Sequence, residues 1–191
     1  MQEDRRKNME NKIIIISGAT GTGKTSTAGI LTENAPSRLA VHLHTDDFYQ
    51  YIKRGYIAPW LEEAGDQNET VAEVIAASAR SYAEGGYEVY VDGVIGPWFL
   101  KPWQNMAGEG IDVRYVVLRP GEQVTVQRAA EREQRACFPL DAAVVAGLWR
   151  MFADLGEFEA HAVDTSFQTV QESAECIAER LRAGEFCLGK N

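Results

Sequence analysis

The stretch IIIISGATGTGKTSTAGIL, residues Ile13 to Leu31, joins a run of four isoleucines to a glycine-rich segment. The isoleucines predict a strand that is buried on both faces, as a central strand of a parallel sheet is. The residues from Lys24 onward predict a helix, and Gly18–Thr25 matches the pattern G-x-x-x-x-G-K-S/T. Between a strand and a helix, this pattern predicts a phosphate-binding P-loop, because its backbone N–H groups and the positive helix end face one anion.

The residues of this loop carry the predicted nucleotide site. We expect Lys24 to reach the β- and γ-phosphates and the Thr25 hydroxyl to coordinate Mg²⁺. A turn that only connects a strand to a helix would explain the glycines but not the lysine and threonine beside them. A guanine-reading Asn-Lys-x-Asp motif is not recognisable, which weakens a GTPase interpretation. The predicted nucleotide-binding residues are Gly18, Ala19, Thr20, Gly21, Thr22, Gly23, Lys24, Thr25, Ser26 and Arg128.

Composition and charge limit the partners of the chain. The 191 residues are 45% hydrophobic and 25% charged, values typical of one globular domain, here residues 12–191 after a polar leader of residues 1–11. A net charge of −9 argues against nucleic acid or an anionic membrane surface as the main partner. No apolar run approaches the roughly 20 residues of a membrane-spanning helix. Three cysteines without metal-like spacing indicate reduced thiols, so we expect a cytoplasmic protein.

Strand and helix patterns alternate along the chain. Asp141 is placed to cap the helix that follows it, and Thr169 and Glu172 have the spacing of a capping box. The alternation predicts one doubly wound α/β domain with a parallel sheet and right-handed crossovers. The predicted strands are 12–17, 39–44, 87–91, 113–118 and 160–163, and the predicted helices are 24–34, 69–84, 121–135, 142–155 and a last one from about 169.

Two aspartates follow predicted strands, at the edge where the catalytic groups of open parallel sheets gather. Asp46 is placed to accept the proton of an acceptor hydroxyl as that hydroxyl attacks the γ-phosphate. Asp47 is the alternative base, although Asp47-Phe-Tyr-Gln50 has the form of a helix N-cap whose glutamine returns to it. Asp92 would hold Mg²⁺ through water. Its alternative role is to start a turn with Gly93.

Two histidines precede Asp46 on the same predicted strand. His42 and His44 are two residues apart and therefore share one face of it. Because no third ligand is in view, we interpret them as packed or loop-bonded side chains and not as a metal pair.

Three arginines form a candidate lid over residues 128–140. Helical spacing brings Arg128, Arg132 and Arg135 onto adjoining positions, where they could close over the phosphates and offset transition-state charge. The alternative is a surface ion pair between Glu131 and Arg135, which stand four residues apart in the favourable order. We assign a catalytic role to Arg135 and a nucleotide-binding role to Arg128.

Aromatic residues gather in the segments 46–66 and 93–108, after the second and third strands. Aromatic faces stack on rings and on the apolar faces of sugars, so we expect an acceptor site for a ring-bearing molecule. The alternative, a local core under a long loop, accounts for about half of them. Lys53 and Arg54 are the nearby cations before the third strand, too few for the phosphate of a nucleotide acceptor, which favours a neutral one. The aromatic residues are Phe48, Tyr49, Tyr51, Tyr56, Trp60, Trp98, Phe99 and Trp103.

Over about residues 12–181, these motifs resemble the small P-loop kinase superfamily, the group of shikimate kinase, gluconate kinase and chloramphenicol phosphotransferase. TDDFY, residues 45–49, is similar to the segment whose aspartate activates the acceptor in uridine-kinase-like and chloramphenicol-phosphotransferase-like enzymes. RACFPL, residues 135–140, resembles the lid of shikimate kinases. HAVDTSFQTVQES, residues 161–173, resembles the last strand and turn that lie along the adenine.

The resemblance implies a three-layer α/β/α fold with a five-stranded parallel sheet in the order 2-3-1-4-5. It also implies ATP as donor, Mg²⁺, and phosphorylation of a small hydroxyl compound. Adjacent aspartates replace the Asp-x-Asp of shikimate kinases, so shikimate is a poor candidate acceptor. We predict an ATP-dependent kinase for a small ring-bearing hydroxyl compound, with Lys24, Asp46 and Arg135 as catalytic residues. A nucleotide-binding switch or sensor without a small acceptor, and a nucleoside or nucleotide kinase, are the alternatives.

Overall fold

A computed structural model describes residues 12–133 and 141–189 of the chain. At its centre is a five-stranded sheet with the strand order β2-β3-β1-β4-β5, and every neighbouring pair is parallel. The predicted α/β class and the predicted order are therefore confirmed. The strands are β1 (Lys12–Ser17), β2 (Ala40–His44), β3 (Glu88–Gly93), β4 (Asp112–Leu118) and β5 (Ala162–Val163).

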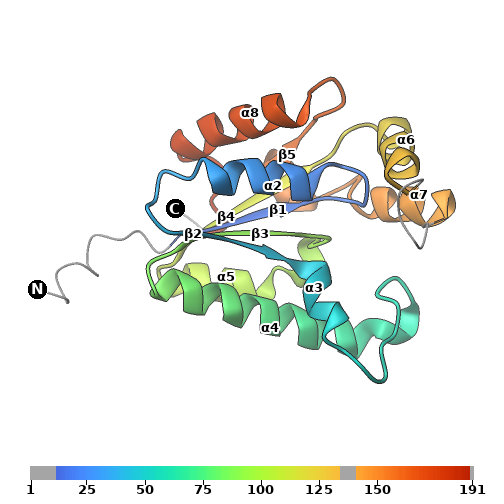
Figure 1. The fold of residues 1–191 in the computed structure, drawn as a ribbon, viewed down its shortest axis with the longest axis horizontal. Helices are drawn as coiled ribbons and strands as arrows, with labels where there is room; N and C mark the ends of the chain where they lie inside the picture. Colours follow the sequence, from blue (N-terminus) through green and yellow to red (C-terminus); the bar gives the residue numbers. More distant parts are fainter. Residues whose placement is uncertain (1–11, 134–140, 190–191) are drawn as a thin grey trace, which may run out of the picture.

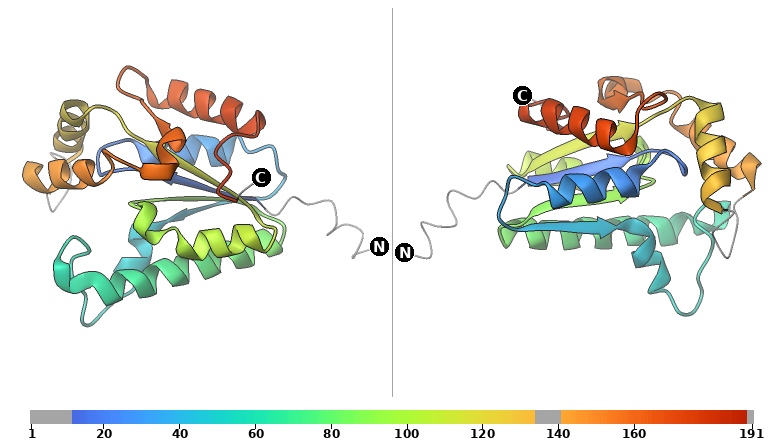
Figure 2. Two further views of the ribbon diagram at one scale, coloured as in Figure 1. Left: turned by 180° about the vertical axis from the view of Figure 1, so that it is seen from behind. Right: turned by 45° about the horizontal axis from the view of Figure 1, so that its top comes forward.

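Helices cover both faces of this sheet (Figure 1). One face carries α2 (Lys24–Glu33) and α8 (Val170–Arg182), and the other carries α4 (Gly65–Glu84) and α5 (Lys101–Gly108), as the two views of Figure 2 also show. Three helices lie toward the carboxyl ends of the strands: α3 (Thr45–Gln50), α6 (Glu122–Glu133) and α7 (Ala142–Met151). The 3-10 turns are η1 (Glu62–Ala64), η2 (Pro97–Phe99) and η3 (Gly156–His161).

The four isoleucines of β1 divide between the two halves of the core. Ile13 and Ile15 pack in the cluster with α4 and α5, whereas Ile14 and Ile16 pack in the cluster with α2 and α8. All four are fully buried, and burying each one stabilises the fold by about 1.5–3 kcal/mol. The central strand is therefore a rigid support for the loop that follows it.

Two predicted helix caps are confirmed. Asp141 accepts a hydrogen bond from the Ala143 backbone N–H at the start of α7. At the start of α8, the Thr169 side chain accepts from the Glu172 backbone, and the Glu172 carboxylate accepts from the Thr169 backbone.

Some element bounds differ from the prediction. α4 begins at Gly65 and not near Glu69, because η1 leads directly into it. α7 ends at Met151 and not at Leu155, since the chain turns beyond it to bury Leu155 in the core. β5 is shorter than expected, with two residues against β4.

The helix α3 begins directly at the end of β2. His44 is its N-cap residue, in extended conformation, and Asp46 and Asp47 lie in its first turn. The interpretation of Asp47 as an N-cap is therefore wrong. Thr45 is buried against Gly93, at which a Cβ atom would come within 2.1 Å of Thr45 Oγ1. The first residue of α3 therefore lies directly against the end of β3.

Two further observations concern membranes and cysteines. Within residues 12–133 and 141–189, no helix is both long enough and apolar enough to cross a membrane. Cys176 and Cys187 are free thiols, and Cys137 lies outside the described residues.

Candidate active site

The loop between β1 and α2 has the conformation that its glycines predict. Gly18 and Gly21 have φ values of 140° and 89°, a region in which residues with a side chain are strained. Neighbouring backbone also leaves no room for one, because a Cβ at Gly18 would lie 2.4 Å from Leu118 O and one at Gly21 2.5 Å from Thr125 O. The loop is thus pressed against the end of β4 and the first turn of α6, and both glycines are required.

Lys24 is the first residue of α2 and lies back over this loop. Its Nζ donates a hydrogen bond of 2.9 Å to the carbonyl of Ala19, and the residue is 9% exposed. The Thr22 hydroxyl donates to the same carbonyl over 2.9 Å and closes the turn. The predicted phosphate-binding lysine and the backbone of the loop are therefore brought together.

Thr25 and Asp92, the two predicted magnesium ligands, are in direct contact. The Thr25 hydroxyl donates to Asp92 Oδ2 over 2.7 Å, and Asp92 is fully buried at the end of β3. Mg²⁺ bound with nucleotide phosphates needs only one or two protein oxygens and keeps several waters. This hydroxyl and carboxylate fit that requirement. Within the described ranges, no three or more His, Cys, Asp or Glu side chains are grouped to hold a metal by themselves.

Sequence reasoning missed the role of the two histidines, which both contact Asp92. His42 Nε2 lies 2.6 Å from Asp92 Oδ1, and His44 Nδ1 lies 3.0 Å and 3.1 Å from its two oxygens. His44 Nε2 also lies 3.5 Å from Asp46 Oδ2. The cause is the register of the sheet, in which His44 pairs with Asp92 across β2 and β3. The spacing of two residues indicates that both histidines point to the same face of β2. It does not identify their partner, because Asp92 lies on another strand.

The pKa values of this cluster shift in opposite directions. The ion pairs with Asp46 and with Asp92 raise the pKa of His44 to about 10. The bond with His44 lowers the pKa of Asp46. Burial alone would raise the pKa of Asp92, but the bonds from His42, His44 and Thr25 outweigh it and leave that pKa lowered. Both carboxylates are therefore ionised at neutral pH, and His44 is protonated between them.

Asp46 and Asp47 differ in where their side chains lie. Asp46 lines a cavity that also contacts the P-loop at Thr20. Asp47 does not line this cavity, and its carboxylate accepts a bond of 3.4 Å from Gln50 Nε2 on the exposed side of α3. This geometry favours Asp46 as the residue that meets an acceptor, and its role as a base stays a prediction.

The cavity beside Asp46 has a volume of about 700 Å³ and a largely apolar lining that includes several aromatic residues. Phe48 and Tyr51 do not line it, and they pack edge to face with each other, with ring centroids 6.0 Å apart. Residues of α4 and α7, such as Ile75 and Met151, also line it although they lie outside the predicted segments. The predicted aromatic residues that do line it are Tyr49, Tyr56, Trp60, Trp98, Phe99 and Trp103.

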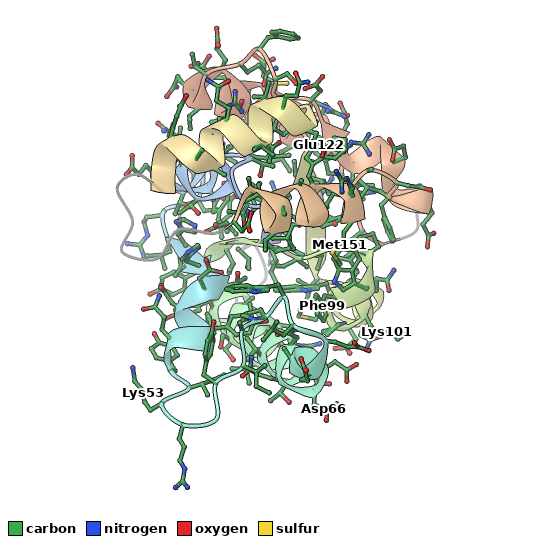
Figure 3. All side chains as sticks on the ribbon, turned by 90° about the vertical axis from the view of Figure 1, so that its right-hand side faces the viewer. Lys53, Asp66, Phe99, Lys101, Glu122 and Met151 are labelled. Atoms are coloured by element: carbon green, nitrogen blue, oxygen red, sulfur yellow. The ribbon has the colours of Figure 1, made fainter. Side chains whose placement is uncertain are left out.

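Two polar side chains of the cavity lining, Tyr49 and Asn68, are joined to each other. The Tyr49 hydroxyl donates to Asn68 Oδ1 over 3.1 Å, and Asn68 Nδ2 donates to the Pro59 carbonyl over 2.8 Å. Among the residues described, Asp46 is the single charged side chain in the lining. Lys53 lies at the outer edge of the loop before α4, away from Phe99 and Met151 in Figure 3. The cavity thus offers aromatic faces and one carboxylate, without a cation.

The predicted lid is described only in part. Arg128 Nη2 donates to the carbonyls of Thr165 and Gln168, over 3.1 Å and 3.2 Å, and so ties α6 to the turn before α8. Its nucleotide-binding role stays a prediction. Arg135 lies outside the described residues, as do residues 134–140 of the proposed lid and the alternative pair with Glu131.

Comparisons with known proteins agree with this fold. A family model described as chloramphenicol phosphotransferase-like protein matches residues 11–182. No curated protein sequence matches the chain significantly.

Solved structures share the architecture at low sequence identity. A sugar kinase from Janibacter sp. has a TM-score of 0.66 and 15% identity, over 94% of this chain and 99% of that one. Shikimate kinase from Acinetobacter baumannii in complex with shikimate has a TM-score of 0.62 and 19% identity, over 94% and 98%. A chain of the Pnkp1/Rnl/Hen1 RNA repair complex has a TM-score of 0.57 and 18% identity, over 73% of this chain but 43% of that one. At these identities, the similarity establishes the fold.

Proposed function

Because this chain belongs to the chloramphenicol phosphotransferase-like proteins, we propose that it moves the γ-phosphate of ATP to a hydroxyl of a small, uncharged, ring-bearing molecule. One observation carries the proposal, namely that Thr20 of the P-loop and Asp46 of α3 line the same cavity. A phosphate bound by the P-loop would lie beside an acceptor in that cavity, with a carboxylate next to both.

Four side chains have separate roles in the proposed reaction. Lys24 binds the β- and γ-phosphates and offsets the charge that spreads over the transferred group. Thr25 and Asp92 would hold Mg²⁺, which neutralises phosphate charge when it is bound. Asp46 orients the acceptor hydroxyl. The hydroxyl oxygen forms a bond to the γ-phosphorus as the bond to the bridging oxygen of ADP breaks, and Asp46 takes the hydroxyl proton. The Asp46 side chain is 64% exposed, so the proton can pass to solvent.

The charge of the cavity argues for an uncharged acceptor. A carboxylate or phosphate on the acceptor would enter a site whose one charged lining residue is Asp46, among the residues described. The ion pair with His44 offsets the charge of Asp46, but the described lining has no cation to pair with a second anion, so the lost hydration of that anion would not be offset. Aromatic faces, by contrast, stack on neutral rings. We therefore disfavour shikimate-like acids and nucleotides as acceptors, whereas a nucleoside satisfies the charge condition.

The first test is a phosphorylation screen read by mass shift. The protein, ATP and Mg²⁺ are incubated with neutral ring-bearing alcohols, sugars and nucleosides, and separately with hydroxy acids and nucleotides. We expect a gain of one phosphoryl group on a neutral compound. ATP hydrolysis without any phosphorylated compound would instead support a nucleotide-dependent switch, and phosphorylation of acids alone would contradict the proposed acceptor class.

Two pairs of variants test the assigned roles. Lys24→Ala should abolish tight ATP·Mg²⁺ binding and transfer, whereas Lys53→Ala removes the same charge outside the cavity and serves as its control. Asp46→Asn should lower the transfer rate by roughly 10²–10⁴ and leave nucleotide affinity nearly intact. Asp47→Asn is the matched control on the same turn. A rate loss in Asp47→Asn alone would make Asp47 the base.

A further inference from the structure

His44 contacts two carboxylates to which the proposed function gives different tasks. It is the last residue of β2 and the N-cap of α3, so it lies where the sheet meets the helix that carries Asp46. One ring nitrogen bonds Asp92, and the other contacts Asp46 at 3.5 Å. A single imidazole therefore links the buried end of β3 to the lining of the cavity.

The contact with Asp92 fixes the orientation of this ring. Nδ1 lies 3.0 Å and 3.1 Å from the two Asp92 oxygens, and an ionised carboxylate only accepts hydrogen bonds. Nδ1 must therefore donate, and the direction of that bond turns Nε2 toward Asp46. Asp92 is itself held by Thr25 and His42. The position of the Asp92 carboxylate, against which the His44 ring is oriented, therefore does not depend on His44.

Asp46, in contrast, has little else to hold its carboxylate. Its side chain is 64% exposed and could rotate among several rotamers. His44 lies within ion-pair distance of Asp46, and Lys24 attracts the same carboxylate electrostatically. An exposed side chain takes its orientation from the groups that it contacts, and His44 is such a contact for Asp46.

We propose that His44 is a positioning residue, which holds the Asp46 carboxylate in one orientation relative to Asp92 and so aligns the acceptor hydroxyl with the phosphate. This inference rests on the proposed kinase function. Reacting atoms must stay within about 3–3.5 Å and in line, and a misplacement of about 1 Å can cost roughly 100-fold in rate. His44 acts through Asp46 and touches neither substrate itself.

Three substitutions separate the two contacts of the ring. His44→Asn places an amide nitrogen near the position of Nδ1, so it keeps the Asp92 bond and loses the Asp46 contact. His44→Gln places one near Nε2, so it keeps the Asp46 contact and loses the Asp92 bond. His42→Asn removes the other histidine bond to Asp92 without touching Asp46, and it measures the cost of weakening Asp92.

We expect His44→Asn to lower kcat by roughly 10- to 100-fold and to leave ATP affinity nearly unchanged. His44→Gln should restore part of that loss, because it still contacts Asp46 but no longer fixes that contact on Asp92. In an Asp46→Asn background, His44→Asn should have no additional effect, since residues that act as a unit are non-additive. Equal losses in His44→Asn and His44→Gln, or a full additional loss in the Asp46→Asn background, would overturn the proposal.

One measurement does not depend on the folding of the His44 variants. The ¹⁵N signal of His44 Nε2 should move in Asp46→Asn, and the signals of His42 should stay in place. An unmoved His44 signal would show that the contact is absent in solution and would overturn the proposal.

The proposed kinase function and the role of His44 can be disproved separately. If the unaltered protein phosphorylates no compound, or if Asp46→Asn transfers at full rate, the proposed function or its base is wrong and this inference falls with it. If Asp46→Asn is slow while His44→Asn is as fast as the unaltered protein, only the role of His44 is wrong.

Discussion

Replacing Gly93 with alanine tests whether the position of Asp46 depends on the contact between β3 and α3. A Cβ at residue 93 would lie 2.1 Å from Thr45 Oγ1, 2.4 Å from its Cγ2 and 2.8 Å from its Cβ. Rotation of Thr45 about χ1 would move Oγ1 and Cγ2, but it would leave the Cβ in place. β3 is paired on both sides, with β1 and β2. The backbone of α3 must therefore be the part that retreats.

The size of the retreat follows from ordinary contact distances. Carbon atoms pack at about 3.5–4.0 Å, so Thr45 must move by about 1 Å, and the next residue along the chain is Asp46. A displacement of this size costs roughly 100-fold in rate. Overpacking of this kind lowers the free energy of unfolding by about 1–3 kcal/mol. In a chain of this length, each kcal/mol corresponds to about 2–4 °C in Tm.

We therefore expect Gly93→Ala to lower kcat by about 100-fold and Tm by roughly 2–12 °C, with little change in ATP affinity. ADP release with the acceptor from the screen measures the rate, and scanning calorimetry measures Tm. The matched variant is Thr45→Gly, which removes the side chain that the new methyl group meets. The double variant should be about as fast as Thr45→Gly alone. Unchanged kcat and Tm in Gly93→Ala, or a double variant as slow as Gly93→Ala, would show that the contact between β3 and α3 does not position Asp46.

Three further predictions concern the acceptor, the fold and pH. Trp98→Ala should raise the acceptor KM by roughly tenfold and leave the ATP KM unchanged in steady-state kinetics; equal rises in both would contradict its place in the cavity. Thr169→Ala removes the capping box of α8 and should lower stability by about 1 kcal/mol, or about 2–4 °C by calorimetry; an unchanged Tm would show that the cap contributes nothing. The pairs with Asp46 and Asp92 raise the pKa of His44 to about 10, above the ~6.5 of an unfolded chain. Their contribution to stability is complete below pH ~6.5 and is lost as pH rises toward ~10. Without nucleotide or metal, Tm should decline more steeply over this range in the unaltered protein than in Asp46→Asn, and parallel declines would contradict the ion pair.

The local elements of this fold could be predicted from the sequence because each depends on neighbouring residues. Four adjacent isoleucines define a strand buried on both faces wherever they are placed in a sheet. Gly18 and Gly21 have positive φ values, which residues with a side chain rarely adopt. Asp141 and Thr169 cap helices through bonds to residues two or three positions away. The strand order itself came from the resemblance of these motifs to a family.

Only the tertiary structure brought the groups of the candidate site together. His44 and Asp92 are far apart in the sequence, and their contact exists because the register of β2 on β3 pairs them. The contact between Thr45, the first residue of α3, and Gly93 of β3 leaves no room for a Cβ at residue 93, and the sequence around Asp47 contains no sign of that contact. Hydrophobic periodicity specifies which face of a strand is buried. It does not specify which residue of the next strand lies opposite, because register is decided by packing across the whole sheet.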